Sequence, residues 1–284
     1  MTLFSIYKRY KWRISLTMAL VGIEAVAMLL LPLVIGFAID DLLADSYSGL
    51  WQLTLVGVTV LTSGSLRRFY DTRVYSSIYV DLSSETAEVD KESSTSRLNA
   101  RITMLKELVE FFENSFPELI FNLIGLVGTV IILYSLDYDI FLGCLAILVF
   151  MFIVFGLTGK RTKQLNHQYN DVFEAQVEAI EQRSKSSIRG YMKQLMAWNI
   201  RLSDLETIVF GLVWFGMVGL IIFSVVEAVG DGNIKVGLAM STIMYVFQFA
   251  EGSGVLPLHF QQFLRLTEIS SRLKATRDSA FKSE

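Results

Sequence analysis

The chain has 284 residues and a formal net charge of −3, with 52% hydrophobic and only 19% charged residues. Its mean hydropathy is +0.47, which excludes a disordered chain and is unusual for a soluble globular domain. The small net charge and the lack of a basic segment interleaved with aromatic residues argue against a nucleic-acid partner. Because Cys144 is the single cysteine, a disulfide framework and a cysteine metal cluster are both excluded.

Six segments are apolar enough to cross a bilayer, which takes about 20 apolar residues. They are Trp12–Ala38, Leu50–Leu66, Glu118–Leu136, Ile140–Leu157, Ile208–Val229 and Ile234–Leu256. The first is too long for the core of a signal peptide and has no small-residue cleavage site after it, so we expect it to be retained. The sequence therefore predicts an all-α, polytopic membrane protein, with residues 1–284 forming one six-helix domain.

The basic residues give this prediction an orientation. Of the 25 Lys and Arg residues, only Lys235 lies on the outer side if the N-terminal arm is inside. Positive residues stay cytoplasmic, so we expect both termini in the cytoplasm and the protein in a bacterial-type inner membrane. The predicted outer loops are short and acidic.

Two long segments on the inner side continue the membrane helices into the cytoplasm. Each has roughly fifty residues with apolar residues at helical spacing, as at Leu165, Tyr169, Val172 and then Leu195. Serine and charged residues accumulate near Asp90–Ser96 and near Ser184–Gly190, where we expect each pair of helices to turn.

The sixth predicted span carries an ionisable residue. A carboxylate at bilayer depth costs about 2.5 to 3.5 kcal/mol, so Glu251 should face a protein interior or a wet cavity. Val246 and Phe249 lie on another face, which suits lipid or neighbouring helices. A largely polar stripe at helical spacing contains Gly237, Ser241, Met244, Gln248, Glu251, Val255, His259 and Gln262.

A second acid, Glu24, lies about 15 Å from the cytoplasmic start of the first span, which predicts a mid-bilayer position. Two interpretations of the acids stay open. They are hydrogen-bonded or protonated carboxyls that fix helix packing, or they line a cavity that binds a solute or couples protons. Asn122 lies on a similar stripe in the third span. The candidate pathway residues are Glu24, Asn122, Met244, Gln248, Glu251 and His259.

No catalytic or metal-binding constellation is apparent in the sequence. The two histidines, His167 and His259, fall in a cytoplasmic segment and near the membrane, and spacing brings neither to a second metal ligand. We therefore predict no enzyme activity, no metal and no cofactor.

Four short motifs, in their order along the chain, resemble the transmembrane domain of type I ABC exporters. They are Pro32-Leu-Val-Ile-Gly36 through Ile39-Asp40, Leu136-Asp-Tyr-Asp139, Ile234-Lys-Val-Gly237, and Pro257-Leu258 followed by Ser271-Arg272-Leu273. The resemblance implies six helices that extend into the cytoplasm, and a twelve-helix homodimer.

The sequence departs from that family in two ways. It has no Walker A motif, because Gly156-Leu-Thr-Gly-Lys160 has the wrong glycine spacing, and it continues only a few residues beyond Arg277. The two cytoplasmic hairpins are also shorter than usual for the family, where their tips dock ATPase domains. We expect a transporter that moves a small cationic, metal-chelate or amphipathic solute by alternating access without its own ATPase. The alternatives are a membrane subunit that uses a separately encoded ATPase, and a degenerate scaffold or regulator.

Overall fold

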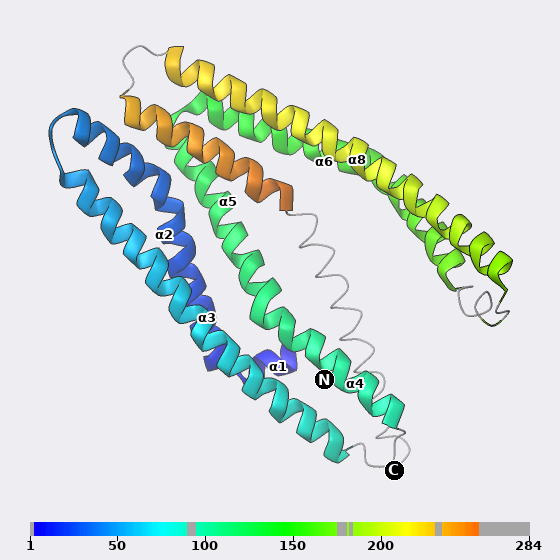
Figure 1. The fold of residues 1–284 in the computed structure, drawn as a ribbon. Coiled ribbons are helices and arrows are strands. Elements are labelled where there is room, and N and C mark those ends of the chain that lie inside the picture. Colours follow the sequence, from blue (N-terminus) through cyan, green and yellow to red (C-terminus); the bar gives the residue numbers. More distant parts are fainter. Residues whose placement is uncertain (1–2, 90–94, 175–180, 182–183, 231–234, 256–284) are drawn as a thin grey trace. The chain divides into compact units, whose positions relative to one another are not determined.

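The computed structural model describes residues 3–89, 95–174, 181, 184–230 and 235–255, and these contain no strand. The helices are α1 (Leu3–Arg9), α2 (Lys11–Leu43), α3 (Ser48–Val89), α4 (Thr95–Glu110), η1 (Phe111–Ser115), α5 (Phe116–Leu136), α6 (Tyr138–Glu174), α8 (Lys185–Gly230) and a last helix at residues 236–255 (Figure 1). The predicted all-α architecture is confirmed for the described residues.

Five of these helices are long and apolar enough to cross a membrane. They are Lys11–Leu43, Ser48–Glu88, Arg101–Leu136, Tyr138–Phe173 and Lys185–Gly230, and each contains one of the first five predicted spans. The described part of the sixth predicted span, Ile234–Leu256, is the helix at residues 236–255. The structure therefore supports a multi-pass membrane protein.

The chain divides into two compact units. Unit 1 is Met1–Leu136 together with Ala228–Glu284, and unit 2 is Asp137–Glu227. Among the described helices, unit 1 contains α1 to α5 and residues 236–255, and unit 2 is the hairpin of α6 and α8.

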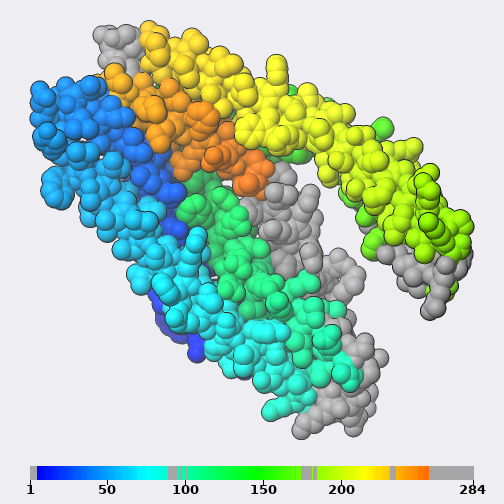
Figure 2. Space-filling model, in the orientation of Figure 1, coloured from blue at the N-terminus to red at the C-terminus, as the bar shows by residue number. Residues whose placement is uncertain are grey.

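In unit 1, α2 and α3 form a long antiparallel hairpin. The chain reverses at residues 44–47, where Asp45 adopts a φ of 58°. A Cβ on Gly49 would lie 2.6 Å from the Ala38 Cα, so only glycine lets the two helices approach this closely beside the turn. The space between the two ribbons in Figure 1 is filled by side chains in Figure 2.

Two adjacent acids at the end of α2 each cap the start of another helix. Asp41 Oδ2 accepts hydrogen bonds from the Gly49 N–H at 2.8 Å and the Ser48 hydroxyl at 2.5 Å, at the start of α3. Asp40 Oδ1 accepts a hydrogen bond from the Gly237 N–H at 2.8 Å. Carboxylates at helix N-termini satisfy unpaired N–H groups and complement the helix dipole. These two acids at the end of α2 therefore hold three helix ends together.

A π-helical turn, η1, joins α4 to α5. The Phe116 N–H bonds to the Phe111 carbonyl, five residues back. Pro117, which follows directly, has no N–H to donate and would clash with the carbonyl four residues earlier in a regular helix, so the wider turn relieves that conflict. The helix that contains the third predicted span consequently begins well before Glu118.

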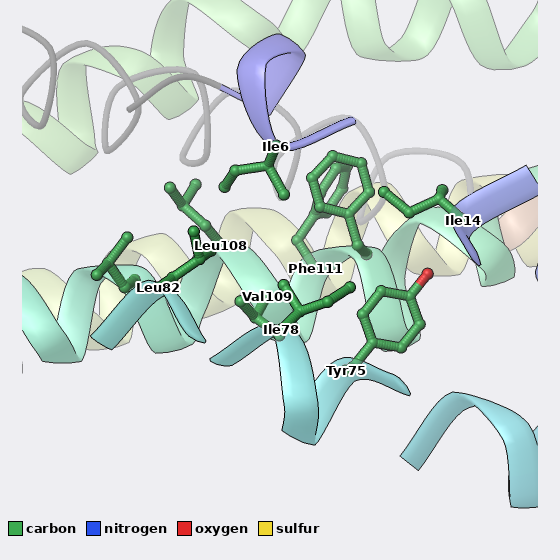
Figure 3. Packing of buried hydrophobic residues seen from close by; sticks show 10 residues of the cluster. Ile6, Ile14, Tyr75, Ile78, Leu82, Leu108, Val109 and Phe111 are labelled. Carbon is green, nitrogen blue, oxygen red and sulfur yellow. The ribbon is translucent and has the colours of Figure 1, made fainter. Parts of the chain in front are cut away.

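An apolar cluster lies at the end of unit 1 where α1, α2, α3 and α4 meet. Its buried residues are Ile6, Ile14, Tyr75, Ile78, Leu82, Leu105, Leu108, Val109, Phe111 and Phe112. Figure 3 shows Ile6 and Ile14 on one side, Ile78 and Leu82 on the other, and Phe111 between them. The short helix α1 is thereby anchored to the hairpin of α2 and α3.

Unit 2 is packed mainly through apolar side chains. Cys144 and Met217 are buried, and Leu220 lies over Gly143. Further along, Tyr191 and Leu195 cluster with Tyr169, as the predicted helical spacing required. The predicted turn at Ser184–Gly190 is wrong in part, because α8 already begins at Lys185; serine favours the first turn of a helix as well as a loop. The other predicted turn, Asp90–Ser96, falls between α3 and α4, largely outside the described residues.

Candidate functional site

Glu24, the first candidate, is paired with an arginine. Arg67 Nε donates a hydrogen bond to Glu24 Oε2 at 2.7 Å, and the two side chains are only 21% and 16% exposed. A Cβ on Gly64 would lie 2.9 Å from Glu24 Oε1, so the glycine leaves room for the carboxylate against α3. The charge of Glu24 is therefore already matched within the subunit.

The pair is part of a longer polar chain between α2 and α3. Arg67 Nη1 lies 3.6 Å from Asp71 Oδ2, and the Thr17 hydroxyl donates to Asp71 Oδ1 at 2.6 Å. Thr17 and Asp71 are both buried. The Arg67 guanidinium thus lies between the carboxylates of Glu24 and Asp71. Each of the two helices contributes two polar side chains to this chain of contacts, one helical turn or more apart. Such contacts fix one register of the hairpin because no other offset would satisfy these buried groups.

The same contacts define which part of α3 lies beside Glu24. Gly64 lies near the end of the predicted second span, Leu50–Leu66, and Arg67 directly follows that span. The mid-bilayer placement counted residues from the start of α2. This helix has 33 residues and is about 50 Å long, which exceeds the roughly 30 Å hydrocarbon core, and the depth of Glu24 in the bilayer stays a prediction.

The helix at residues 236–255 is joined to α2 by hydrogen bonds to its backbone. The Ser241 hydroxyl donates to the Pro32 carbonyl at 2.8 Å, and the Tyr245 hydroxyl donates to the Leu29 carbonyl at 2.8 Å. A Cβ on Gly237 would lie 2.8 Å from the Gly36 carbonyl carbon, so the two backbones touch where both residues are glycine.

These contacts divide the predicted polar stripe of the sixth span. Gly237 and Ser241 are buried against α2, whereas Glu251 is exposed and Met244 and Gln248 are half-buried. The first part of the stripe is therefore used for packing against α2. A change of neighbour explains the difference, because the helix packs on α2 at its start and beside Leu126 of α5 near Gly252.

The opposite face of this helix packs inside the protein. Val246 and Phe249 are fully buried, which matches the neighbouring-helix alternative and not the lipid one. The Gln248 side-chain oxygen is buried without a hydrogen-bond partner among the described residues. Glu251 is thus an exposed carboxylate, and it lies on the same side of the helix as the exposed Met240 and Phe247.

The remaining candidates are less constrained. Asn122 is half-buried in α5. His259 lies outside the described residues. Within the part of the chain that the structure describes, no three His, Cys, Asp or Glu residues gather as a metal site would require.

Sequence reasoning missed both Arg67 and Asp71: Arg67 was counted only among the basic residues expected on the cytoplasmic side, and Asp71 was not singled out. A usable signal was present, because Glu24 precedes Ala44 by as many residues as Arg67 follows Tyr47. In an antiparallel hairpin that turns at residues 44–47, these two positions must lie at the same level. An acid and a base placed symmetrically about a short turn predict an ion pair.

Comparison with known proteins gives the chain a family. No curated protein matches it. Residues 3–237 match the family of ABC transporter transmembrane regions, and they cover most of the 284-residue chain, including α1 to α6 and α8. The chain belongs to this family of ABC transporter transmembrane regions.

Proposed function

We propose that the protein is the membrane-spanning part of a transporter that moves a small solute by alternating access, as a homodimer with both termini in the cytoplasm. Its family and its long apolar helices support a transport role. The observation that carries the solute site is the exposed carboxylate of Glu251 on a helix whose other faces are packed on α2 and buried. A charge at such a position is costly unless it serves a cavity.

The solute is a cation or carries a cationic or chelated centre. Glu251 offers a carboxylate, and Gln248 and Met244, on the same stripe, offer an amide oxygen and a thioether. Glu24 is less suited to bind a solute, because Arg67 already neutralises it. We therefore assign the solute contact to Glu251 and a packing role to Glu24.

Family membership favours ATP hydrolysis by a nucleotide-binding partner over an ion gradient as the energy source. The proposed arrangement is a membrane subunit that engages an ATPase on a separate polypeptide. Stable co-purification of an ATPase with the tagged protein supports this arrangement. Solute movement by the purified chain alone in proteoliposomes, driven by an imposed proton gradient, contradicts it.

The solute site is tested by transport of a fluorescent lipophilic cation into membrane vesicles that contain the full-length protein. We expect Glu251→Gln to reduce the initial rate at least tenfold at equal protein level. Glu206→Gln is the matched control, because Glu206 is an exposed acid of α8 outside the predicted spans, and it should leave the rate unchanged. Equal rates for Glu251→Gln and the unmodified protein would rule out the assigned contact.

A further inference from the structure

The exposed apolar side of α3 marks where the hydrocarbon begins and ends. Trp51 is 76% exposed and Phe69 is 65% exposed, and about 27 Å of helix separates them. Exposed apolar residues such as Leu55 and Leu66 lie between. Tryptophan and tyrosine favour both edges of a bilayer, whose hydrocarbon core is about 30 Å thick, and Tyr70 directly follows Phe69. Phe69 therefore lies at the edge of the hydrocarbon on the side of the N-terminus.

Basic residues gather directly beyond Phe69. The Tyr70 hydroxyl donates to the Arg13 carbonyl at 3.3 Å, and Arg13 Nη1 donates to the Ser77 hydroxyl at 3.5 Å. Arg73 lies between Tyr70 and Ser77 on α3, so the start of α2 places Arg13 beside it. Lys11 and Arg73 are exposed, as is Arg13. Three cations thus share the level at which phospholipid headgroups lie.

These cations are associated with aromatic rings and not with acids. Lys11 Nζ lies 5.7 Å from the centre of the Trp12 ring, and the Arg73 guanidinium carbon lies 5.4 Å from that of Phe69. Among the residues that the structure describes, no carboxylate forms an ion pair with Lys11, Arg13 or Arg73. A cation over an exposed aromatic ring is typical of the membrane interface, where the ring lies at headgroup level.

The acids nearby are committed elsewhere. Glu85 accepts a hydrogen bond from Arg9, and this bond raises the pKa of the Arg9 guanidinium above its usual value. Asp71 is buried against Thr17 and Arg67. The exposed Asp81 is about 12 Å further along α3 from Arg73. The patch around Arg13 and Arg73 is therefore positively charged and open to an external anion.

We propose that Arg13 and Arg73 form a docking surface for the phosphate of an anionic phospholipid, with Lys11 adding positive charge at the same level. Guanidinium groups bind phosphate oxygens through paired N–H donors, and Trp12, which is 80% exposed, provides an apolar contact for the glycerol and upper acyl region. A lipid held here contacts both α2 and α3 at the end of the hairpin that carries α1. It would thus brace the N-terminal helix against the membrane.

The test uses the full-length protein in a nonionic detergent, titrated with phosphatidylglycerol and, separately, with phosphatidylcholine. Retained lipid is counted by native mass spectrometry. A basic residue near a membrane surface contributes about fivefold to the affinity for anionic lipid, so we expect Arg13→Gln with Arg73→Gln to weaken phosphatidylglycerol retention about 25-fold. Phosphatidylcholine should be retained poorly by both proteins.

Two further variants separate a specific site from general charge and from misfolding. Arg189→Gln with Lys193→Gln removes the same charge from exposed positions of α8 far from the predicted spans, and it should retain phosphatidylglycerol normally. Arg13→Lys with Arg73→Lys keeps the charge but loses the paired N–H donors, so its binding of phosphatidylglycerol should lie between that of the glutamine variant and that of the unmodified protein. The proposal is overturned if the α8 variant loses as much lipid as the Arg13 and Arg73 variant, or if millimolar inorganic phosphate displaces the lipid completely.

Discussion

The helices within unit 1 and those within unit 2 pack through different kinds of contact. In unit 1, Arg67 of α3 and Ser241 and Tyr245 of the helix at residues 236–255 donate hydrogen bonds to α2, and Thr17 of α2 donates one to Asp71 of α3. In unit 2, α6 and α8 pack through apolar groups and glycine, and the identified side-chain hydrogen bonds include local ones such as Thr158 to the Val154 carbonyl.

This difference predicts how each unit responds to strain. A polar group inside a membrane protein has few places where its bonds are satisfied, so contacts of this kind fix the offset between two helices. Apolar side chains contact an apolar neighbour almost equally well after a small shift. We therefore expect unit 1 to move as one body around α2 during transport, and α6 and α8 to adjust against each other more easily.

The largest loss of stability should come from adding a methyl group at the close contact between Gly36 and Gly237. In Gly36→Ala the new Cβ would lie 2.9 Å from the Gly237 carbonyl carbon and overlap the Ser241 side chain. Because backbone must move on both sides, we expect a loss of about 3 kcal/mol, measured as unfolding of the full-length protein in detergent.

Gly143→Ala is the matched change in unit 2. There the new Cβ would meet the Leu220 Cδ1 at 2.7 Å, which is the end of a flexible side chain, so the loss should stay below about 1 kcal/mol. Gly22→Ala, with no heavy atom within 4 Å, should not destabilise the protein. Equal losses for Gly36→Ala and Gly143→Ala would erase the contrast between the units.

The next effect concerns the charge shared by α2 and α3. Arg67→Gln leaves the carboxylates of Glu24 and Asp71 facing each other without a cation, and we expect a loss of about 2 kcal/mol because the pair is partly exposed. The double change Arg67→Gln with Glu24→Gln removes one of the two unmatched charges and should recover about half of that loss. A double variant no more stable than Arg67→Gln would show that Glu24 is not the partner that matters.

Two helix caps give a smaller and more selective effect. Asp40→Ala removes the cap of the helix at residues 236–255 and also a bond between remote helices, whereas Asp137→Ala removes only the local acceptor for the Asp139 and Ile140 N–H groups in α6. Each change should cost about 1 kcal/mol of stability. Hydrogen exchange should nevertheless differ, with faster exchange reaching residues 236–245 for Asp40→Ala and staying within the first turn of α6 for Asp137→Ala.

Much of the fold could be predicted from the sequence because long apolar runs in lipid have one stable local form. Each of the predicted spans from Trp12–Ala38 to Ile208–Val229 lies in an observed helix, since a backbone in hydrocarbon must satisfy its own hydrogen bonds. The extension of these helices beyond the spans also followed from spacing such as Tyr169 and Leu195.

The candidate site was less predictable because it depends on which helix lies beside which. Helical spacing placed Ser241 and Glu251 on one stripe, but only the neighbours α2 and α5 decide that the first is buried and the second exposed. The partner of Glu24 required the register of the α2 and α3 hairpin, which the count of positive charges in loops does not contain. Helical spacing shows which residues share a face, and the neighbouring helices decide whether those residues are buried or exposed.

The smallest loss of stability is expected at hydroxyl groups. One of the two compared here bonds to another helix, and the other bonds within its own helix. The Tyr245 hydroxyl bonds to the Leu29 carbonyl on another helix, and the Thr158 hydroxyl bonds to Val154 one turn earlier on its own helix. Tyr245→Phe should cost about 0.6 kcal/mol, the average measured for hydrogen bonds between membrane helices. Thr158→Val should cost almost nothing, because the Val154 carbonyl keeps its helical partner. If both variants lose the same free energy of unfolding in detergent, hydrogen bonds to α2 do not stabilise unit 1 more than bonds within a helix do. The fixed register of unit 1 must then come from its glycine contacts alone.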